Sequence, residues 1–221
     1  MSNIEIKGLR IQRGLRDIIA QFDLKVEAGT SVVIHGANGS GKTTLLRALA
    51  GLMPIAEGKV LINGHHYEED RISIHQSIIY IGHRDGFSGS LTAHENLKLW
   101  AQSKGHEAAE IKARVENSLS ALGMDDFAET PLYTMSEGQR KRCGLARLSL
   151  SQNLEKSESI WLLDEPLTAL DQVTAATLAK LIDHHTEQGG IAILSSHQDI
   201  SLKRSQKINL DKFSLSIGGQ S

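Results

Sequence analysis

The chain has 221 residues, 40% of them hydrophobic, with 24 basic and 26 acidic side chains. This length suffices for one sizeable core, and we expect one domain over residues 1–221 with an inserted lobe. The near balance of charge gives no positive field for a polyanion, which disfavours a nucleic-acid partner. The first ten residues are too charged for a signal peptide, and no apolar run approaches the roughly 18 residues of a membrane span. We therefore expect a soluble or peripheral protein.

The first predicted elements surround a glycine-rich loop. Ser31 to His35 is an apolar strand candidate, and Lys42 to Ala50 places leucines at helical spacing. Between them the chain fits G-x-x-x-x-G-K-[ST], in which backbone amides and the lysine hold phosphates while the last hydroxyl serves magnesium. The start of the following helix adds its dipole. A glycine-rich turn without a ligand is the weaker alternative. We predict a nucleoside triphosphate site formed by Gly36, Ala37, Asn38, Gly39, Ser40, Gly41, Lys42, Thr43 and Thr44.

The middle of the chain changes character from strand to helix. Ser77 to Ile81 is an apolar strand candidate, whereas residues 82–135 carry helical signals. Thr92 and Glu95 have the spacing of a capping box. One apolar stripe at helical spacing consists of Ile111, Val115, Leu119 and Leu122. These signals favour a helical lobe over about residues 84–150.

Two carboxylates follow a predicted buried strand. Ile160 to Leu163 is apolar, and Asp164 and Glu165 come directly after it. The carboxyl ends of strands form the rim at which doubly wound sheets bind ligands. We predict that Asp164 acts on the magnesium shell, through water, and that Glu165 polarises the attacking water. The alternative, two solvated acids at the end of a strand, is weakened by the phosphate loop in the same chain.

Strands and helices alternate through the rest of the chain. A helix is expected over about Ala175 to His185, and Ile191 to Ser195 is a further strand. Short extended pieces between glycines fill Ile55 to Tyr67. This alternation indicates an α/β fold with a mostly parallel sheet covered on both faces. The polar tail after Asp199 has no clear pattern, and no element is predicted there.

Three motifs in this order resemble the ATP-binding cassette (ABC) family. They are the loop at Gly36 to Thr43, the segment Met135 to Gln139, and the run Trp161 to Pro166, and the resemblance covers nearly the whole chain. It implies a P-loop NTPase with a RecA-like core, an antiparallel β subdomain and an inserted helical lobe. It also implies an ATPase that uses ATP and Mg²⁺.

The second motif implies a homodimer. In the family this segment contacts the triphosphate bound by a second copy, so that two sites form only in a head-to-tail dimer. Ser136, Gly138 and Gln139 match the usual signature, whereas Met135 and Glu137 replace a leucine and a glycine. An ordinary Ser-x-x-Gln helix cap is the alternative reading of the same residues.

Two later residues take their expected roles from the same resemblance. Asp171 ends a Thr-Ala-Leu-Asp segment that resembles the one crossing the dimer seam. His197 resembles the histidine that contacts the γ-phosphate and orients water. A lone histidine at the end of a strand is more often structural, but its position beyond Glu165 favours the catalytic role.

Departures from the general family narrow the resemblance. His83 stands where most cassettes have a glutamine, and because Mg²⁺ prefers oxygen ligands we expect it to act through water or as a coupling contact to a membrane partner. No aromatic ring is available near residues 12–15 to stack on adenine, so an arginine is expected instead. The candidates are Arg10, Arg13 and Arg16.

These departures, together with Leu91 to Leu97, Ala146 to Leu148 and His184 to Ile191, resemble the ATP-binding subunits of bacterial cytochrome c maturation systems. The resemblance implies a peripheral subunit on the cytoplasmic side of the cell inner membrane, paired with integral membrane subunits that handle haem or its chaperone. Two alternatives stay open: an exporter ATPase for another substrate, and a soluble cassette with a regulatory or mechanical role.

Overall fold

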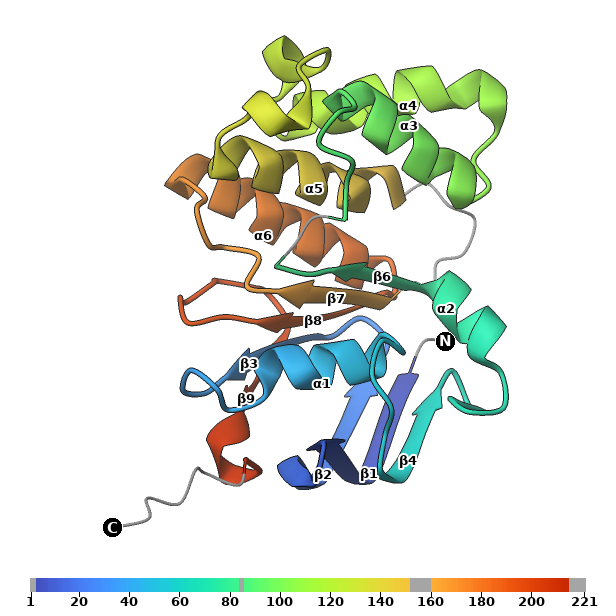
Figure 1. Ribbon diagram of the computed structural model, residues 1–221, viewed down its shortest axis with the longest axis vertical. Coiled ribbons are helices and arrows are strands. Elements are labelled where there is room, and N and C mark those ends of the chain that lie inside the picture. Colours follow the sequence, from blue (N-terminus) through green and yellow to red (C-terminus); the bar gives the residue numbers. More distant parts are fainter. Residues whose placement is uncertain (1–2, 84–85, 152–159, 215–221) are drawn as a thin grey trace.

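The computed structural model describes residues 3–83, 86–151 and 160–214. It contains a five-stranded and a four-stranded sheet. In Figure 1 the helices α3 to α6 lie above the five-stranded sheet, and helix α1 and the four-stranded sheet lie below it. The mixed α/β architecture expected from the sequence is confirmed.

The five-stranded sheet is entirely parallel in its paired strands. Its order is β6-β7-β8-β3-β9. Every residue of β7 and β8 is buried, as expected for a parallel sheet covered on both faces. The strands are β3 (Ser31–His35), β6 (Ile78–Ile81), β7 (Ile160–Asp164), β8 (Ile191–Ser195) and β9 (Ser205–Asn209). All but β9 were predicted, to within one residue at each end.

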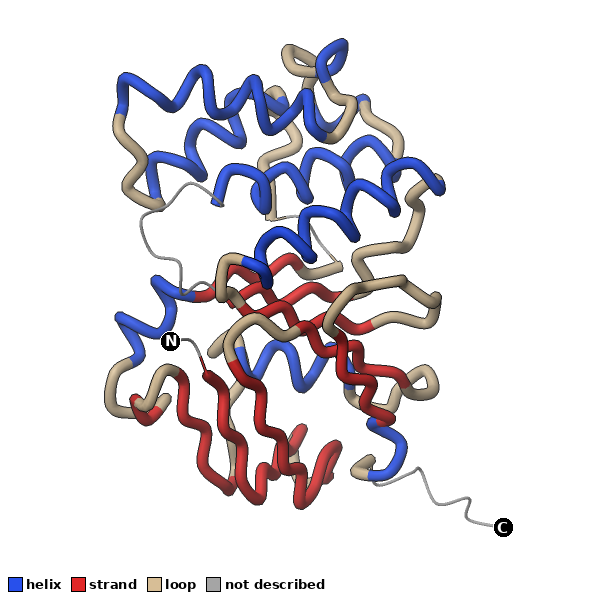
Figure 2. Tube along the Cα trace, turned by 180° about the vertical axis from the view of Figure 1, so that it is seen from behind, coloured by secondary structure: helices blue, strands red, loops and turns tan. Residues whose placement is uncertain are grey.

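The four-stranded sheet is antiparallel and packs beneath α1. Its strands are β1 (Asn3–Arg13), β2 (Arg16–Glu27), β4 (Glu57–Ile62) and β5 (His65–His66), in the order β2-β1-β4-β5. Ile4, Ile6, Leu9 and Ile11 are buried on one side of β1. The extended pieces expected between residues 55 and 67 are confirmed, whereas β1 and β2 were not predicted. Figure 2 shows this sheet from behind.

The helical segment follows its sequence signals closely. Its helices are α3 (Ala93–Ser103), α4 (Ala108–Ala121) and α5 (Glu137–Ser151), with short turns η1 (Asp125–Phe127) and η2 (Leu132–Thr134) between them. The capping box is present: the Glu95 amide donates to Thr92 Oγ1 at 3.1 Å and the Thr92 amide to Glu95 Oε2 at 2.9 Å. The whole apolar stripe of α4 and Leu122 is buried. That the helical segment forms a separate lobe over residues 84–150 stays a prediction.

Three further elements complete the described chain. They are α1 (Lys42–Leu49), α2 (Arg71–Ser77) and α6 (Gln172–Glu187), with η3 (Leu210–Lys212) after β9. Helix α6 begins earlier than expected because Asp171 caps it, accepting a hydrogen bond of 2.7 Å from the Thr174 amide. Helix α2 was not predicted.

The parallel sheet divides the core into two clusters. One holds Leu45 and Leu46 of α1 together with the antiparallel sheet, and the other holds side chains of α3 to α6. Burying each large aliphatic side chain stabilises the fold by about 1.5–3 kcal/mol. The carboxyl ends of β3, β7 and β8 therefore stand on a scaffold that is packed on both faces.

Candidate active site

The glycine loop joins β3 to α1, and its backbone conformation requires glycine at two places. Gly41 precedes α1 with a φ of 98°, and a Cβ there would lie 2.9 Å from the Ile18 side chain. Gly36 has a φ of 153°, and a Cβ would lie 2.6 Å from Ser40 Oγ. Helix α1 has no acidic residue in its first turn and no side-chain cap. Its first amides are therefore left for an anion.

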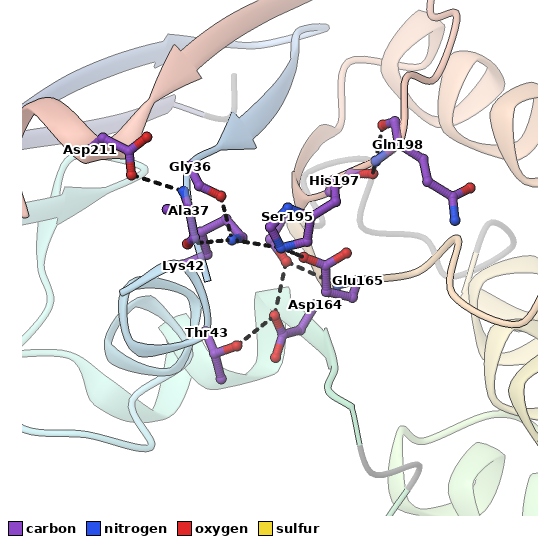
Figure 3. A network of polar contacts seen from close by, with 11 residues as sticks. Gly36, Ala37, Lys42, Thr43, Asp164, Glu165, Ser195, His197, Gln198 and Asp211 are labelled. Atoms are coloured by element: carbon purple, nitrogen blue, oxygen red, sulfur yellow. Dashed lines mark hydrogen bonds and ion pairs between the residues drawn. The ribbon is translucent and has the colours of Figure 1, made fainter. Parts of the chain in front are cut away.

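Lys42 is turned into the loop rather than toward solvent. It is only 6% exposed, and Nζ donates to the carbonyl oxygens of Gly36 at 2.9 Å and Ala37 at 3.1 Å. Its third polar neighbour is Nε2 of His197, at 3.0 Å (Figure 3). An ammonium has no acceptor, so this contact requires an unprotonated Nε2.

Glu165 competes with Lys42 for the same histidine nitrogen. His197 Nε2 lies 3.4 Å from Glu165 Oε1, which is buried and accepts no hydrogen bond among the described residues. Nε2 can donate to the carboxylate only when it carries the proton that the Lys42 contact excludes. Glu165 also has a φ of 47°, a left-handed conformation that is uncommon outside glycine and concentrates at functional sites.

Asp164 collects hydroxyl donors from two directions. Thr43 Oγ1 and Ser195 Oγ both donate to Asp164 Oδ1 at 2.9 Å. The Ser195 hydroxyl also accepts the Glu165 amide at 2.9 Å. Asp164 is 1% exposed, and a buried carboxylate needs such partners to stay charged. The predicted residues Thr43, Asp164, Glu165, His197 and Lys42 thus lie together.

Two members of this cluster were missed in the sequence. Ser195 pairs in register with Asp164 across β7 and β8, so its position at the end of an apolar strand was a usable signal. Asp211, in η3, accepts the Ala37 amide at 2.9 Å and so fastens the start of the loop. The sequence carried no signal for Asp211, because it lies in the unpatterned tail.

Oxygen donors make the centre of the cluster suitable for Mg²⁺. The Thr43 hydroxyl and the Asp164 carboxylate approach each other within 2.9 Å at the start of α1. Mg²⁺ prefers oxygen ligands and commonly takes one or two carboxylates together with substrate phosphates. The Thr43 and Asp164 side chains therefore fit the Mg²⁺ ion that the glycine-loop motif predicts.

The signature residues lie apart from this cluster, at the start of α5. The Ser136 amide donates to Gln139 Oε1 at 2.8 Å, and the Gln139 amide to Ser136 Oγ at 3.3 Å, so the helix-cap reading holds within one chain. A Cβ on Gly138 would lie 2.9 Å from the carbonyl oxygen of Ala169. Among the described residues, no hydrogen bond or ion pair joins Ser136, Gly138, Gln139 or Asp171 to the glycine loop.

Asp171 acts within the chain as the α6 cap. The hydrogen bond from Thr174 is the main reason why the pKa of this exposed carboxyl is lowered. The close approach of Gly138 to Ala169 brings the start of α5 next to the segment that ends at Asp171. The two expected dimer elements are therefore neighbours of each other.

His83 is exposed and lines a cleft of about 580 Å³ between β6 and α5. Phe87, Lys141 and Thr168 also line it. Burial lowers the pKa of Lys141, and the Asp164 and Glu165 carboxylates oppose that shift. The cleft thus adjoins the carboxylate end of β7, although His83 is not part of the hydroxyl and carboxylate cluster.

The three candidate adenine contacts differ in how they are held. Arg10 is held by Asp17, with Nε to Oδ1 and Nη2 to Oδ2 both 2.8 Å, and by Glu57 at 2.6 Å. These carboxylates raise its pKa. Arg13 and Arg16 face each other at the β1–β2 turn and remain as candidates.

Known proteins resemble this chain over most of its length. The family described as ABC transporter matches residues 19–168. The chain is 36% identical over 214 residues to the cytochrome c biogenesis ATP-binding export protein CcmA of Paramagnetospirillum magneticum, covering 97% of this chain and 96% of the relative. It is 39% identical over 198 residues to the protein of that name from Pseudomonas fluorescens, covering 90% of each.

A solved structure shares the fold. It is the dimeric post-hydrolysis state of an ATP-binding cassette bound to ADP and Pi, with a TM-score of 0.79 and 23% identity over 94% of this chain and 95% of that one. None of the helices in the described ranges is long and apolar enough to cross a membrane. From the family match, the two relatives and the shared fold, the chain belongs to the ABC transporter family, as an ATP-hydrolysing cassette.

Proposed function

We propose that this chain is the ATPase subunit of a membrane complex in cytochrome c biogenesis, where hydrolysis drives haem-chaperone release or haem export. The similarity to two export proteins of cytochrome c biogenesis, over 90% or more of the chain, supports the process. The cluster around Asp164 supports the chemistry. Integral membrane subunits would be its partners, and the cytoplasmic side of the inner membrane its location.

The observation that carries the chemistry is the contact of Thr43 with Asp164, beside the Lys42, His197 and Glu165 chain. Thr43 and Asp164 would hold Mg²⁺, the latter through water. When bound, the ion supplies positive charge that neutralises the phosphate oxygens during transfer.

Lys42 and His197 change partners when the triphosphate binds. The carbonyl oxygens of Gly36 and Ala37 occupy the Lys42 ammonium in this structure, and phosphate oxygens are stronger acceptors for it. Once Lys42 is drawn to phosphate, His197 Nε2 is released to face the phosphate and the water. Glu165, whose Oε1 accepts no hydrogen bond from the residues that the structure describes, is left to accept a proton from that water.

A second copy would complete the site. Ser136, Gly138 and Gln139 lie at a helix start, where amides and a hydroxyl suit a phosphate, yet they do not bond to the loop of their own chain. A head-to-tail homodimer would bring them to the triphosphate of the partner copy, with Asp171 at the seam. The solved dimeric cassette has the same fold, so proteins of this fold can form dimers, which supports this arrangement.

His83 is the proposed coupling residue. Its exposed ring lines the cleft between β6 and α5, where a segment of a membrane subunit can reach it. This cleft also borders Thr168, whose amide donates to the Glu165 carbonyl oxygen at 3.3 Å. A displacement in the cleft would therefore change the position of Glu165.

Complementation tests the proposed process. The chain is expressed in a bacterium that lacks its own ATP-binding subunit for cytochrome c biogenesis, and covalently bound haem in c-type cytochromes is measured. We expect restoration by the wild type and none by Glu165→Gln, at equal protein levels. Haem attachment that is not restored, while the purified chain hydrolyses ATP with the membrane subunits of another exporter, would favour the alternative substrate.

A further inference from the structure

A partly buried tyrosine next to the proposed metal site has no role in the scheme above. Tyr80 lies on β6, and its hydroxyl is buried; the Arg47 guanidinium can donate to it, but its own proton has no acceptor among the described residues. Its ring folds back over the main chain of Gly82, since a Cβ on Gly82 would lie 2.9 Å from both Cε1 and Oη. A buried hydroxyl whose proton is unpaired is costly, so this one requires an explanation.

The sheet register directs this hydroxyl toward Asp164. Tyr80 pairs with Leu162, and side chains alternate along a strand, so Tyr80 and Asp164 share one face of the sheet. Ile81 pairs with Leu163, which puts Gly82 at the level of Asp164. Because the Tyr80 hydroxyl lies against Gly82, it reaches that level from the β6 side, as Ser195 does from β8.

Electrostatics keep this phenol protonated. Burial is the main cause that raises the pKa of Tyr80, and the negative charge of Asp164 acts in the same direction. The Arg47 guanidinium, from the last turn of α1, lowers this pKa, mainly by hydrogen bonding to the phenol oxygen. Tyr80 therefore keeps its proton at neutral pH and can donate one hydrogen bond while it accepts another.

Asp164 leaves one oxygen for such a partner. Thr43 and Ser195 both donate to Oδ1, and no hydrogen bond to Oδ2 exists among the described residues. Mg²⁺ gives up its water reluctantly and usually keeps several water molecules when it binds a protein. A water on the ion donates hydrogen bonds, and Asp164 Oδ2 and Tyr80 Oη, which share one face of the sheet, are the candidate acceptors.

We infer that Tyr80 is a positioning residue for the metal ion, and that its hydroxyl holds a metal-bound water beside Asp164. The inference rests on the proposed Mg²⁺–ATP site. It assigns an oxygen from β6 to the metal shell, three residues before His83, whose imidazole is a poor magnesium ligand. Tyr80 would also join the ion physically to the segment that leads to His83.

Metal affinity, rather than activity, tests this role. Tyr80→Phe removes only the hydroxyl and keeps the ring over Gly82. In the Glu165→Gln background with saturating ATP, Mn²⁺ is titrated and followed by electron paramagnetic resonance. We expect the dissociation constant for Mn²⁺ to rise about threefold to tenfold, because one hydrogen bond to the metal-bound water is lost. ATP affinity in EDTA should stay within about twofold.

Tyr67→Phe is the matched control. Tyr67 is also buried, but its hydroxyl lies 3.5 Å from His75 Nε2 and faces Gly51. Its removal should leave the Mn²⁺ affinity unchanged. Equal affinities for Tyr80→Phe and its Glu165→Gln parent, or equal losses in the two Phe variants, would overturn the role of Tyr80. A parent protein that binds ATP but no Mn²⁺ would instead overturn the metal site itself.

Discussion

The two ends of the proposed composite site differ in how much of their geometry one chain provides. At the glycine loop, side chains from α1, β7 and β8 already contact one another, and Asp164 accepts hydrogen bonds from two hydroxyls. At the start of α5, the side chains of Ser136 and Gln139 hydrogen-bond to each other's backbone amides. The fold of one chain thus assembles the first end, which we call the prepared end. At the second end, which we call the waiting end, one chain provides a capped helix start that would contact the triphosphate of another copy. Changes at the second end should therefore reduce hydrolysis and leave the binding of ATP to one chain intact, whereas changes at the first end can reduce either.

The largest effect is expected for Glu165→Gln, at the prepared end. The amide keeps the side-chain volume but cannot accept the proton of the attacking water, so hydrolysis should fall by about a hundredfold or more. ATP binding should persist, because Lys42 and Thr43 are unchanged. Phosphate release measures the first effect and calorimetry the second.

The same variant tests whether the second end needs another copy. With ATP trapped, Glu165→Gln should accumulate as a dimer by light scattering, whereas the ATP-free protein should not. A protein that binds ATP and stays monomeric, even with its membrane subunits present, would contradict the head-to-tail site.

Lys42→Ala should remove the tight binding of nucleotide at the prepared end. The buried ammonium supplies charge to the β and γ phosphates, and losing such a buried charge contact should weaken ATP binding by about a hundredfold. Titration calorimetry measures the ATP affinity. Lys98→Ala, which changes an exposed lysine of α3, is the control. Unchanged affinity would remove Lys42 from the site.

Gly138→Ala should act at the waiting end only. The new Cβ would lie 2.9 Å from the Ala169 carbonyl, so the start of α5 must shift against the segment that leads to Asp171. A small misplacement of positioning groups is costly to catalysis, and we expect about a tenfold loss of hydrolysis at saturating ATP. Binding of ATP to the single chain should stay within about twofold. Glu137→Ala, in the same turn, should show no such loss.

The contrast also explains what the sequence could and could not reveal. The strand, loop and helix around Lys42 carry local patterns, and so does the apolar strand before Asp164, so both were predictable. Asp211 and Ser195 contribute through partners 174 and 31 residues away. The apolar strand before Ser195 marks its position but not its partner, and the neighbourhood of Asp211 has no distinctive pattern. Strands β1 and β2 have buried alternate positions, but register shifts at Ile6, Leu9 and Ile11 interrupt the simple period of two.

His83→Gln should have a smaller effect, and only in the assembled complex. His83 lines the cleft beside α5 and has no place among the contacts of Asp164, so basal hydrolysis of the isolated subunit should stay within about twofold. Stimulation of hydrolysis by the membrane subunits should be reduced. A variant that is inactive in isolation would place the imidazole in the reaction instead.

The smallest effect is expected for Asp171→Asn, which separates the cap from the seam. Asparagine also caps helices, so α6 should keep its start, and the free energy of unfolding at neutral pH should fall only by the small contribution of the charge. The Thr174 hydrogen bond lowers the pKa of Asp171 below its ordinary 3.8. The charge therefore contributes stability above pH 3.8, and this contribution is lost as the pH falls through the lower pKa of the folded state. Thermal melting of the two proteins should converge in acid. If the ATP-bound dimer nevertheless dissociates at neutral pH in Asp171→Asn, the carboxylate is needed across the seam, because the cap within the chain is intact.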